Sequence, residues 1–144
     1  VKDSLNKESF CFTYGDGVGD INIKDLITFH KQSEKKATLT AVQPPGRYGA
    51  LQLKGNEVKF FEEKPLGDKS WINGGFFVIE SAFLKYIKND QTYLEREPLE
   101  RVCKKKELGA YKHKGFWQCM DTKRDKEFLE EIWKRENCPW LIES

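Results

Sequence analysis

The sequence predicts an α/β fold, and three neighbouring segments carry this prediction. The aromatic run Phe10–Tyr14 is typical of a buried strand, a helical pattern begins at Ile23, and Ala37–Val42 is a second apolar run. A strand, a helix and a strand in this order favour a parallel crossover unit. The 144 residues suffice for one domain of ordinary size, although part of a larger domain would have the same length.

The flanking residues indicate where these first elements begin and end. The first strand stops at Gly15-Asp16-Gly17, which is a typical loop sequence. Asn22 is a candidate N-cap for the helix, and the second strand ends before Pro44. The helical face is formed by residues at intervals of three and four, namely Ile23, Leu26, Ile27 and His30. We therefore expect a surface helix between two strands.

The middle of the chain predicts a small antiparallel sheet. Two strand-like runs, Tyr48–Leu53 and Val58–Glu63, are separated by the turn sequence Lys54–Glu57, as in a hairpin. Ile72–Ile79 is a further apolar strand with glycines in its middle. Ser81 is a candidate cap for a helix that reaches about residue 87.

The last third of the chain alternates helices with short strands. A helix is expected over Leu94–Glu107, although Pro98 can instead mark a helix start, because proline is tolerated only in the first turn. Strands are expected over Leu108–Lys112 and Phe116–Met120. A final helix is expected over residues 122–135, with one apolar face formed by Phe128, Leu129, Ile132 and Trp133.

Composition excludes several classes of partner. The 25 basic and 23 acidic residues leave a formal charge of +2, which does not suggest a nucleic-acid partner. No apolar run approaches the about 20 residues that cross a bilayer, so we expect no membrane partner and a cytoplasmic location. The mean hydropathy of −0.71 fits a soluble globular chain. The four cysteines form no C-x-x-C pair and are expected to be reduced thiols that fill space.

Two aspartates at predicted strand ends are candidate metal ligands. Asp16 lies between two glycines that let a metal or phosphate approach the backbone, and Asp121 follows a short aromatic strand. Taken singly, the first fits an ordinary turn and the second an N-cap. As a pair, two carboxylates could hold one Mg²⁺, which prefers oxygen ligands and retains waters and phosphates.

Two further motifs are candidates for contacts with a sugar phosphate. Lys64, in Glu63-Lys64-Pro65, is a mobile positive charge suited to a phosphate. Asn73, in Asn73-Gly74-Gly75, can both donate to and accept from hydroxyl groups, and the glycines let a sugar lie near the backbone. The alternatives are a strand-ending turn for the first motif and a β-bulge for the second.

The order of these motifs resembles the sugar nucleotidyltransferase family. The resemblance runs from about Phe10 to Trp140 and includes Tyr14–Gly17, Glu63–Pro65 and Asn73–Phe77. Within the family, the runs Pro44–Leu51 and Phe116–Thr122 resemble the glucose-1-phosphate cytidylyltransferases. The implied fold is the C-terminal part of a Rossmann-like mixed-sheet nucleotidyltransferase with a small antiparallel sheet.

The resemblance also implies roles for individual residues. Asp16 and Asp121 match the family's two Mg²⁺ ligands, and Lys64 matches the lysine that contacts the sugar phosphate. The residues that match the sugar-binding positions are Gly49, Glu63, Asn73 and Gly74. The implied reaction joins the phosphate of glucose 1-phosphate to the α-phosphorus of CTP, giving CDP-glucose and pyrophosphate.

One element of the family pattern is not found. The family has a G-G-x-G-T-R loop that cradles the triphosphate with backbone N–H groups, and nothing before Asp16 resembles it. We therefore expect residues 1–144 to be a single partial domain with little or no activity alone. Separately, we expect the parent enzyme to form a homo-oligomer.

Three alternatives stay open at this point. The first is a thymidylyl- or uridylyltransferase of the same family, since base choice depends mostly on the missing loop. The second is a non-catalytic domain that binds sugar phosphate. The third is a metal-dependent glycosyltransferase, against which the Glu63–Pro65 and Asn73–Gly75 motifs argue.

Overall fold

The computed structural model describes residues 5, 8–44, 46, 50–62, 70–135 and 138–141. They form two compact units, each built from separate stretches of the chain. The first unit comprises Val1–Gly15, Ile21–Thr40 and Asn73–Lys112, and the second comprises Asp16–Asp20, Ala41–Ile72 and His113–Ser144.

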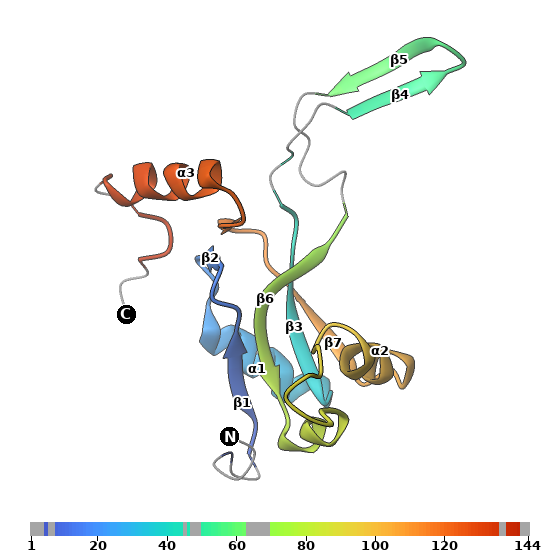
Figure 1. Ribbon diagram of the computed structural model, residues 1–144, viewed down its shortest axis with the longest axis vertical. Helices are drawn as coiled ribbons and strands as arrows, with labels where there is room; N and C mark the ends of the chain where they lie inside the picture. Colours follow the sequence, from blue (N-terminus) through green and yellow to red (C-terminus); the bar gives the residue numbers. More distant parts are fainter. Residues whose placement is uncertain are drawn as a thin grey trace. The chain divides into compact units, whose positions relative to one another are not determined.

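The first unit contains most of a four-stranded sheet, of which Ala41, Val42 and Ile72 are counted in the second unit. Its strands are β1 (Phe10–Thr13), β6 (Ile72–Ile79), β3 (Ala37–Val42) and β7 (Leu108–Lys112), in that spatial order (Figure 1). β1 and β6 are antiparallel, with Phe10 opposite Ile79. β1 therefore lies at one edge of the sheet, and β6 lies between β1 and β3, the first two strands predicted from the sequence.

Backbone hydrogen bonds set the direction of the remaining strands. The Glu80 N–H donates to the Lys36 carbonyl (2.9 Å), which joins the end of β6 to the start of β3, so these strands are antiparallel. The Lys36 N–H donates to Glu107 (2.9 Å) and the His113 N–H to Ala41 (2.9 Å), so β7 runs with β3. β1 and β3 are thus parallel to each other. The predicted crossover unit and the mixed α/β sheet are confirmed.

Helix α1 (Ile23–Ser33) covers one face of the sheet and begins where the sequence predicted. The side chain of Asn22 accepts a hydrogen bond from the Asp25 N–H (3.2 Å), as an N-cap does. His30 is buried on the apolar face, where both of its ring nitrogens have polar partners. Nδ1 lies 2.8 Å from the Thr38 hydroxyl and Nε2 lies 3.0 Å from a Glu80 carboxylate oxygen.

The opposite face carries the main core under η3 (Ser81–Tyr86) and α2 (Glu97–Lys104). Strand side chains alternate between faces, so Phe77 and Ile79 of β6 point into this core whereas Val78 points toward α1. The core is a single cluster of buried side chains: Ala37, Phe77, Ile79, Phe83, Tyr86, Leu99 and Val102. The sheet is therefore sandwiched between helices, as in other α/β folds.

Two helix predictions in this unit were wrong. The segment after β6 is a 3₁₀ helix preceded by Glu80, without a side-chain cap, so Ser81 is not its cap. The next helix does not span Leu94–Glu107 but is only eight residues long, with Pro98 in its first turn. The alternative drawn from Pro98 was correct, because a proline there removes only an N–H that has no helical partner.

The second unit contains two small antiparallel pairs. β4 (Ala50–Lys54) and β5 (Glu57–Glu62) form the predicted hairpin around Gly55 and Asn56. β2 (Gly17–Gly19) pairs with β8 (Trp117–Cys119), and Gly17 lies opposite Cys119. We refer to this second pair as the β2–β8 ribbon. β2 was not predicted, because it has only three residues and two are glycines, which disfavour strands.

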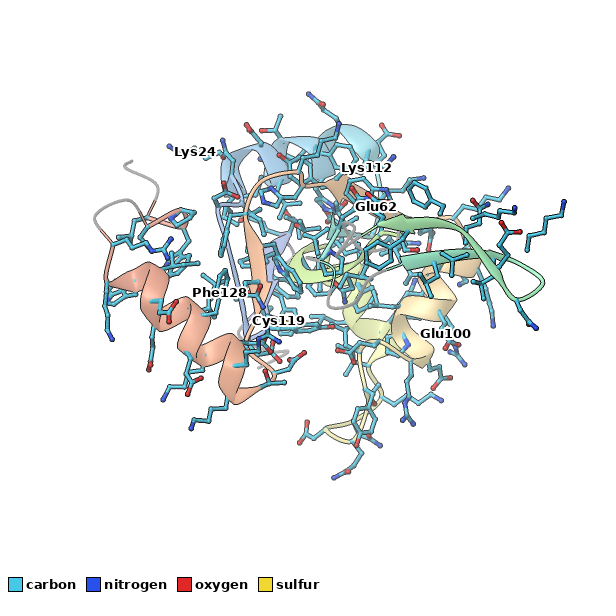
Figure 2. The ribbon with its side chains drawn as sticks, turned by 90° about the horizontal axis from the view of Figure 1, so that it is seen from above. Lys24, Glu62, Glu100, Lys112, Cys119 and Phe128 are labelled. Carbon is cyan, nitrogen blue, oxygen red and sulfur yellow. The ribbon has the colours of Figure 1, made fainter. Side chains whose placement is uncertain are left out.

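Helix α3 (Lys123–Trp133) has a narrower buried face than predicted. Leu129 and Ile132 are buried. Phe128, labelled on α3 in Figure 2, is 44% exposed, and Trp133 is 60% exposed and stacks on Trp140, with ring centroids 6.5 Å apart. Only half of the predicted apolar face is therefore in the core.

Two predictions from composition concerned the cysteines and the length of apolar segments. All four cysteines lie in the described part of the chain, and none forms a disulfide. Cys138 is buried, but Cys11 and Cys103 are exposed and do not fill space, contrary to expectation. Among the described helices, none has the length and apolar character needed to span a bilayer.

We expect the ion pair between Lys36 and Glu107 to make the stability of the first unit depend on pH. Each residue precedes one of two neighbouring parallel strands, β3 and β7. The Lys36 ammonium donates to Glu107, which lowers the pKa of that carboxyl and raises the pKa of Lys36. The carboxylate's contribution is present above its ordinary pKa of 4.5 and is lost as pH falls through its depressed native value. The stabilising contribution of the Lys36 ammonium is present below its ordinary pKa of 10.5 and is lost as pH rises through its raised pKa in the folded state.

Urea unfolding at pH 7 and pH 3 checks this prediction. Lys36→Met should lower the midpoint at pH 7, and the difference from the wild type should shrink at pH 3. Lys24→Met, at an exposed position of α1, is the control and should change neither midpoint appreciably. An equal deficit of Lys36→Met at both pH values would show that the ion pair contributes nothing.

Candidate functional site

Asp16 and Asp121 lie at the same end of the β2–β8 ribbon. The antiparallel register places Gly17 opposite Cys119, and the Met120 N–H donates to the Asp16 carbonyl (2.8 Å). Asp16 therefore adjoins Met120, and Asp121 is the next residue. Both aspartates are exposed. The ribbon thus brings together two carboxylates that are more than 100 residues apart in sequence.

The alternative explanation of Asp121 as an N-cap is wrong. The N-cap of α3 is Thr122, whose hydroxyl accepts from the Asp125 N–H (3.2 Å). Asp125 in turn accepts from the Thr122 N–H (3.0 Å), which completes a capping box. The helix start is thus satisfied by other residues. For Asp16, the turn interpretation holds for the backbone, since the chain bends at Gly15 and Asp16 before β2 begins.

The pair has the chemistry of a magnesium site whose other ligands are waters or phosphate oxygens. Mg²⁺ is usually held by one or two carboxylates and otherwise by waters and substrate phosphates. Two exposed aspartates at one strand end supply this donor set. Within the described residues there is no group of three or more His, Cys, Asp or Glu side chains that could form an all-protein cage. The residues present therefore fit Mg²⁺ bound together with a phosphate.

Asn73 and Gly74 belong to the first unit, and the amide of Asn73 is partly used within the fold. Its Nδ2 donates to the Tyr14 hydroxyl (3.2 Å), and its Oδ1 accepts from the Gly75 N–H (3.0 Å). An asparagine amide has two donors and two acceptor lone pairs, so one of each stays available after these bonds. The contacts orient the side chain, and the predicted contact with sugar hydroxyls stays a prediction.

The second glycine after Asn73, Gly75, is required by its backbone conformation and by its surroundings. Its φ is +80°, and a Cβ there would lie 2.8 Å from Cδ2 of Tyr14. The Tyr14 N–H also donates to the Gly75 carbonyl (2.9 Å). A side chain is excluded both by the backbone conformation and by the Tyr14 ring. Tyr14 is therefore a support for Asn73, a role that the sequence analysis missed.

We expect Gly75→Ala to lower the free energy of unfolding by about 1–3 kcal/mol, because it combines a left-handed backbone with a steric clash. The change should also separate Tyr14 from Asn73. Urea unfolding measures the first effect, and the NMR shift of the Asn73 side-chain amide reports the second. Gly15→Ala is the matched control, since nothing lies within 4 Å of its Cβ position. Equal losses in the two variants would contradict the assigned role of Gly75.

Three predicted site residues lie outside the described residues, namely Gly49, Glu63 and Lys64. Their roles stay predictions. The described neighbours of this region are the ends of the hairpin, Ala50 and Glu62.

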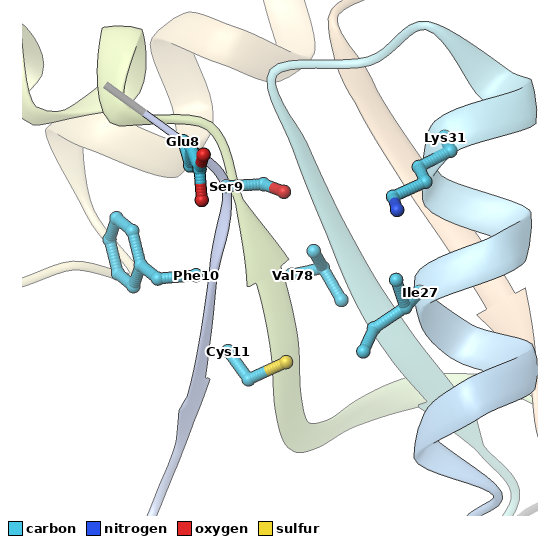
Figure 3. Close-up of a pocket in the computed structure, with 7 residues that line it drawn as sticks. All are labelled: Glu8, Ser9, Phe10, Cys11, Ile27, Lys31 and Val78. Carbon is cyan, nitrogen blue, oxygen red and sulfur yellow. The ribbon is translucent and has the colours of Figure 1, made fainter. Parts of the chain in front are cut away.

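A pocket of about 470 Å³ lies elsewhere in the first unit, between the edge strand β1 and helix α1 (Figure 3). It is lined by apolar side chains such as Ile27 and Val78 and by the charged Glu8 and Lys31. Of the predicted site residues that the structure describes, Asp16, Asn73, Gly74 and Asp121, none lines it. The pocket is therefore not evidence for the chemistry predicted from the motifs.

Comparison with solved structures supports the fold. The chain is similar to a putative glucose-1-phosphate thymidylyltransferase from Bacillus anthracis (TM-score 0.65, 16% identity, 99% of this chain and 59% of that chain). It is also similar to HddC from Yersinia pseudotuberculosis (TM-score 0.65, 18% identity, 92% of this chain and 59% of that chain). These identities are low, so the likeness shows the fold alone.

Comparison with curated sequences gives much higher identities. Glucose-1-phosphate cytidylyltransferase from Salmonella typhimurium is 53% identical over 140 residues, covering 97% of this chain and 53% of that protein. A probable glucose-1-phosphate cytidylyltransferase from Bacillus subtilis is 35% identical, covering 99% of this chain and 56% of that protein. The chain thus spans about half the length of these relatives.

The model of one protein family also matches most of the sequence. That family is described as nucleotidyl transferase, and the match covers residues 1–130. The match covers well over half of the 144 residues, and the fold is similar to those of the solved structures. This chain belongs to the nucleotidyl transferase family.

Proposed function

We propose that this chain is one part of an enzyme that transfers a cytidylyl group from CTP to glucose 1-phosphate, giving CDP-glucose and pyrophosphate. In this proposal residues 1–144 are a partial domain that supplies the metal-binding and sugar-phosphate-binding groups. The observation that carries the proposal is the juxtaposition of Asp16 and Asp121 by the β2–β8 ribbon in a chain of this family.

The chain's own residues account for binding and alignment. Asp16 and Asp121 would hold Mg²⁺, which when bound neutralises charge on the reacting phosphates. Lys64 would bind the phosphate of glucose 1-phosphate against repulsion from the triphosphate. Asn73, oriented by Tyr14, would bind sugar hydroxyls, and Gly49, Glu63 and Gly74 would complete the sugar site.

No general base is required by this assignment. A phosphate monoester has a second pKa of about 6 and is therefore largely ionised near neutral pH. Its oxygen can attack the α-phosphorus without losing a proton to the protein. The residues act by holding the two substrates in line and by balancing charge, which are the main contributions in nucleotidyl and phosphoryl transfer.

The choice of base is supported by the pattern of identities. The Salmonella protein named for cytidylyl transfer is 53% identical, whereas a mannose-1-phosphate guanylyltransferase subunit from Danio rerio is 30% identical. The identity therefore favours CTP over GTP. Because the proposed substrates are small phosphorylated metabolites, we also place the enzyme in the cytoplasm, and we expect a homo-oligomer as in many soluble enzymes.

The full-length protein that contains this chain tests the proposal. With Mg²⁺ and glucose 1-phosphate, CTP should release pyrophosphate at least about tenfold faster than dTTP, UTP or GTP, since one lost base contact typically costs a factor of that size or more. Omitting glucose 1-phosphate should abolish release. Equal rates with dTTP would reject the cytidylyl assignment, and no release with any nucleotide would favour a non-catalytic sugar-phosphate-binding domain.

A further inference from the structure

Asp20 and His113 meet at the end of the β2–β8 ribbon opposite to Asp16 and Asp121. Asp20 directly follows β2, and its N–H donates to the Phe116 carbonyl (3.1 Å), just before β8. The His113 ring lies beside it, with Nε2 2.8 Å from Asp20 Oδ1 and 3.1 Å from the same Phe116 carbonyl. These residues all belong to the second unit.

The surroundings of His113 require a proton on Nε2. Both atoms that face this nitrogen, a carboxylate oxygen and a carbonyl oxygen, can only accept a hydrogen bond. The N–H is aligned with the Phe116 carbonyl, whereas Asp20 Oδ1 is buried and has no aligned donor among the described residues. The His113 side chain is only 9% exposed. The buried oxygen therefore depends on the nearby imidazole for electrostatic compensation.

The pair is fixed in place on both sides. The His113 N–H donates to the Ala41 carbonyl (2.9 Å) at the end of β3, which anchors the histidine. On the other side, a Cβ at Gly115 would lie 2.7 Å from Asp20 Oδ2, closer still to Oδ1, and 2.8 Å from His113 Cε1. The backbone of Gly115 thus packs directly against the pair. A side chain at position 115 would therefore collide with both residues.

The ribbon itself is too short to hold its own register. Each of its strands has three residues, and even longer two-stranded ribbons are only marginally stable in water when isolated. Its register places Asp16 beside Met120, next to Asp121. A shift by one residue would move one of the carboxylates away from the other. The contacts at the far end therefore influence the spacing of the two aspartates.

We propose that His113 and Asp20 are positioning residues that lock the β2–β8 ribbon and thereby hold Asp16 and Asp121 at the spacing needed to share a divalent cation. This inference rests on the proposed function for the role of the cation. It assigns the pair to the alignment of the metal ligands and not to contact with substrate.

Two measurements on the 144-residue chain test the proposal. The first is the NMR exchange rate of the Met120 amide, which donates to Asp16. The second is the dissociation constant for Mn²⁺, used as a spectroscopic substitute for Mg²⁺ and measured by electron paramagnetic resonance. His113→Met and Asp20→Asn should each weaken Mn²⁺ binding by about 10-fold or more, the range found for residues that orient metal ligands. Both should also accelerate exchange of the Met120 amide.

His113→Gln is the conservative variant that separates positioning from packing. Its side-chain amide can still donate to the Phe116 carbonyl and to Asp20, so the exchange rate and the Mn²⁺ affinity should stay within about threefold of the wild type. In the double variant Asp20→Asn with His113→Met, the fold-loss of Mn²⁺ affinity should be smaller than the product of the two single fold-losses, because the two residues act as one unit.

The outcomes separate this inference from the proposed function. If His113→Met binds Mn²⁺ as tightly as the wild type, or if His113→Gln loses as much as His113→Met, the positioning role is overturned. If the wild type itself binds no Mn²⁺, the metal site of the proposed function fails for this chain. Without Mn²⁺ binding, the exchange rate of the Met120 amide still tests whether the pair locks the ribbon. An unchanged rate in His113→Met would overturn the lock as well. A faster rate in His113→Met but not in His113→Gln would support it.

Discussion

Asp16→Asn and Asp121→Asn, each introduced into the full-length protein, should lower pyrophosphate release from CTP by about 100- to 1,000-fold. Each change removes one negative charge from the pair at the end of the β2–β8 ribbon. A bound divalent cation contributes several kcal/mol of charge stabilisation, and about 1.4 kcal/mol corresponds to a factor of ten in rate. The fold should be retained, because both side chains are exposed and neither caps α3.

A coupled assay for pyrophosphate, run over a range of Mg²⁺ concentrations, measures this effect. Glu127→Gln is the control, since it removes one exposed carboxylate from α3 in the same unit. Its activity should match that of the wild type. If the Asp16 and Asp121 variants kept more than about a third of the wild-type rate at saturating Mg²⁺, the carboxylate pair could not be the metal site.

Phe83→Ala should be the most destabilising single change in the first unit. Phe83 is fully buried in the core between the sheet, η3 and α2, and its ring lies edge-on to Tyr86, with centroids 5.8 Å apart. Removing the ring leaves a cavity and loses the aromatic contact. The expected loss is about 3–5 kcal/mol, a large share of the about 5–15 kcal/mol that stabilises a typical domain.

Urea unfolding followed by circular dichroism measures this loss, and Phe128→Ala provides the matched control. The same substitution on α3 removes a ring that is 44% exposed, so it should cost about 1 kcal/mol or less. Losses of similar size in the two variants would show that the cluster around Phe83 is not the core of the first unit.

The order of the elements could be predicted from the sequence, whereas several of their ends could not. Alternation, helical spacing and turn residues located β3, α1 and the β4–β5 hairpin, because each is specified by its own residues. The extent of α2 depended on Pro98, whose meaning could be stated only as two alternatives. β2 has almost no local signal, since its existence depends on pairing with β8 about 100 residues later.

The candidate site shows the same division. Asp16 and Asp121 could be singled out as residues that follow predicted strands, and the ribbon does place them together. The bonds between Asn73 and Tyr14, and between Asp20 and His113, join residues far apart in sequence. Such pairs are set by strand register, which neither composition nor spacing reveals. The positions of Gly49, Glu63 and Lys64 lie outside the described residues.

The insertion of β6 between β1 and β3 has a consequence for the order in which the chain can fold. β1 and β3 leave the ribosome before β6, and neither can complete its pairing until Ile79 has been synthesised. The β4–β5 hairpin is synthesised before β6, the strand that pairs with both β1 and β3. Native pairing therefore depends on closing long loops, which slows folding relative to a sheet of sequential hairpins. Until then, the apolar edges of β1 and β3 are open to chaperones and to each other.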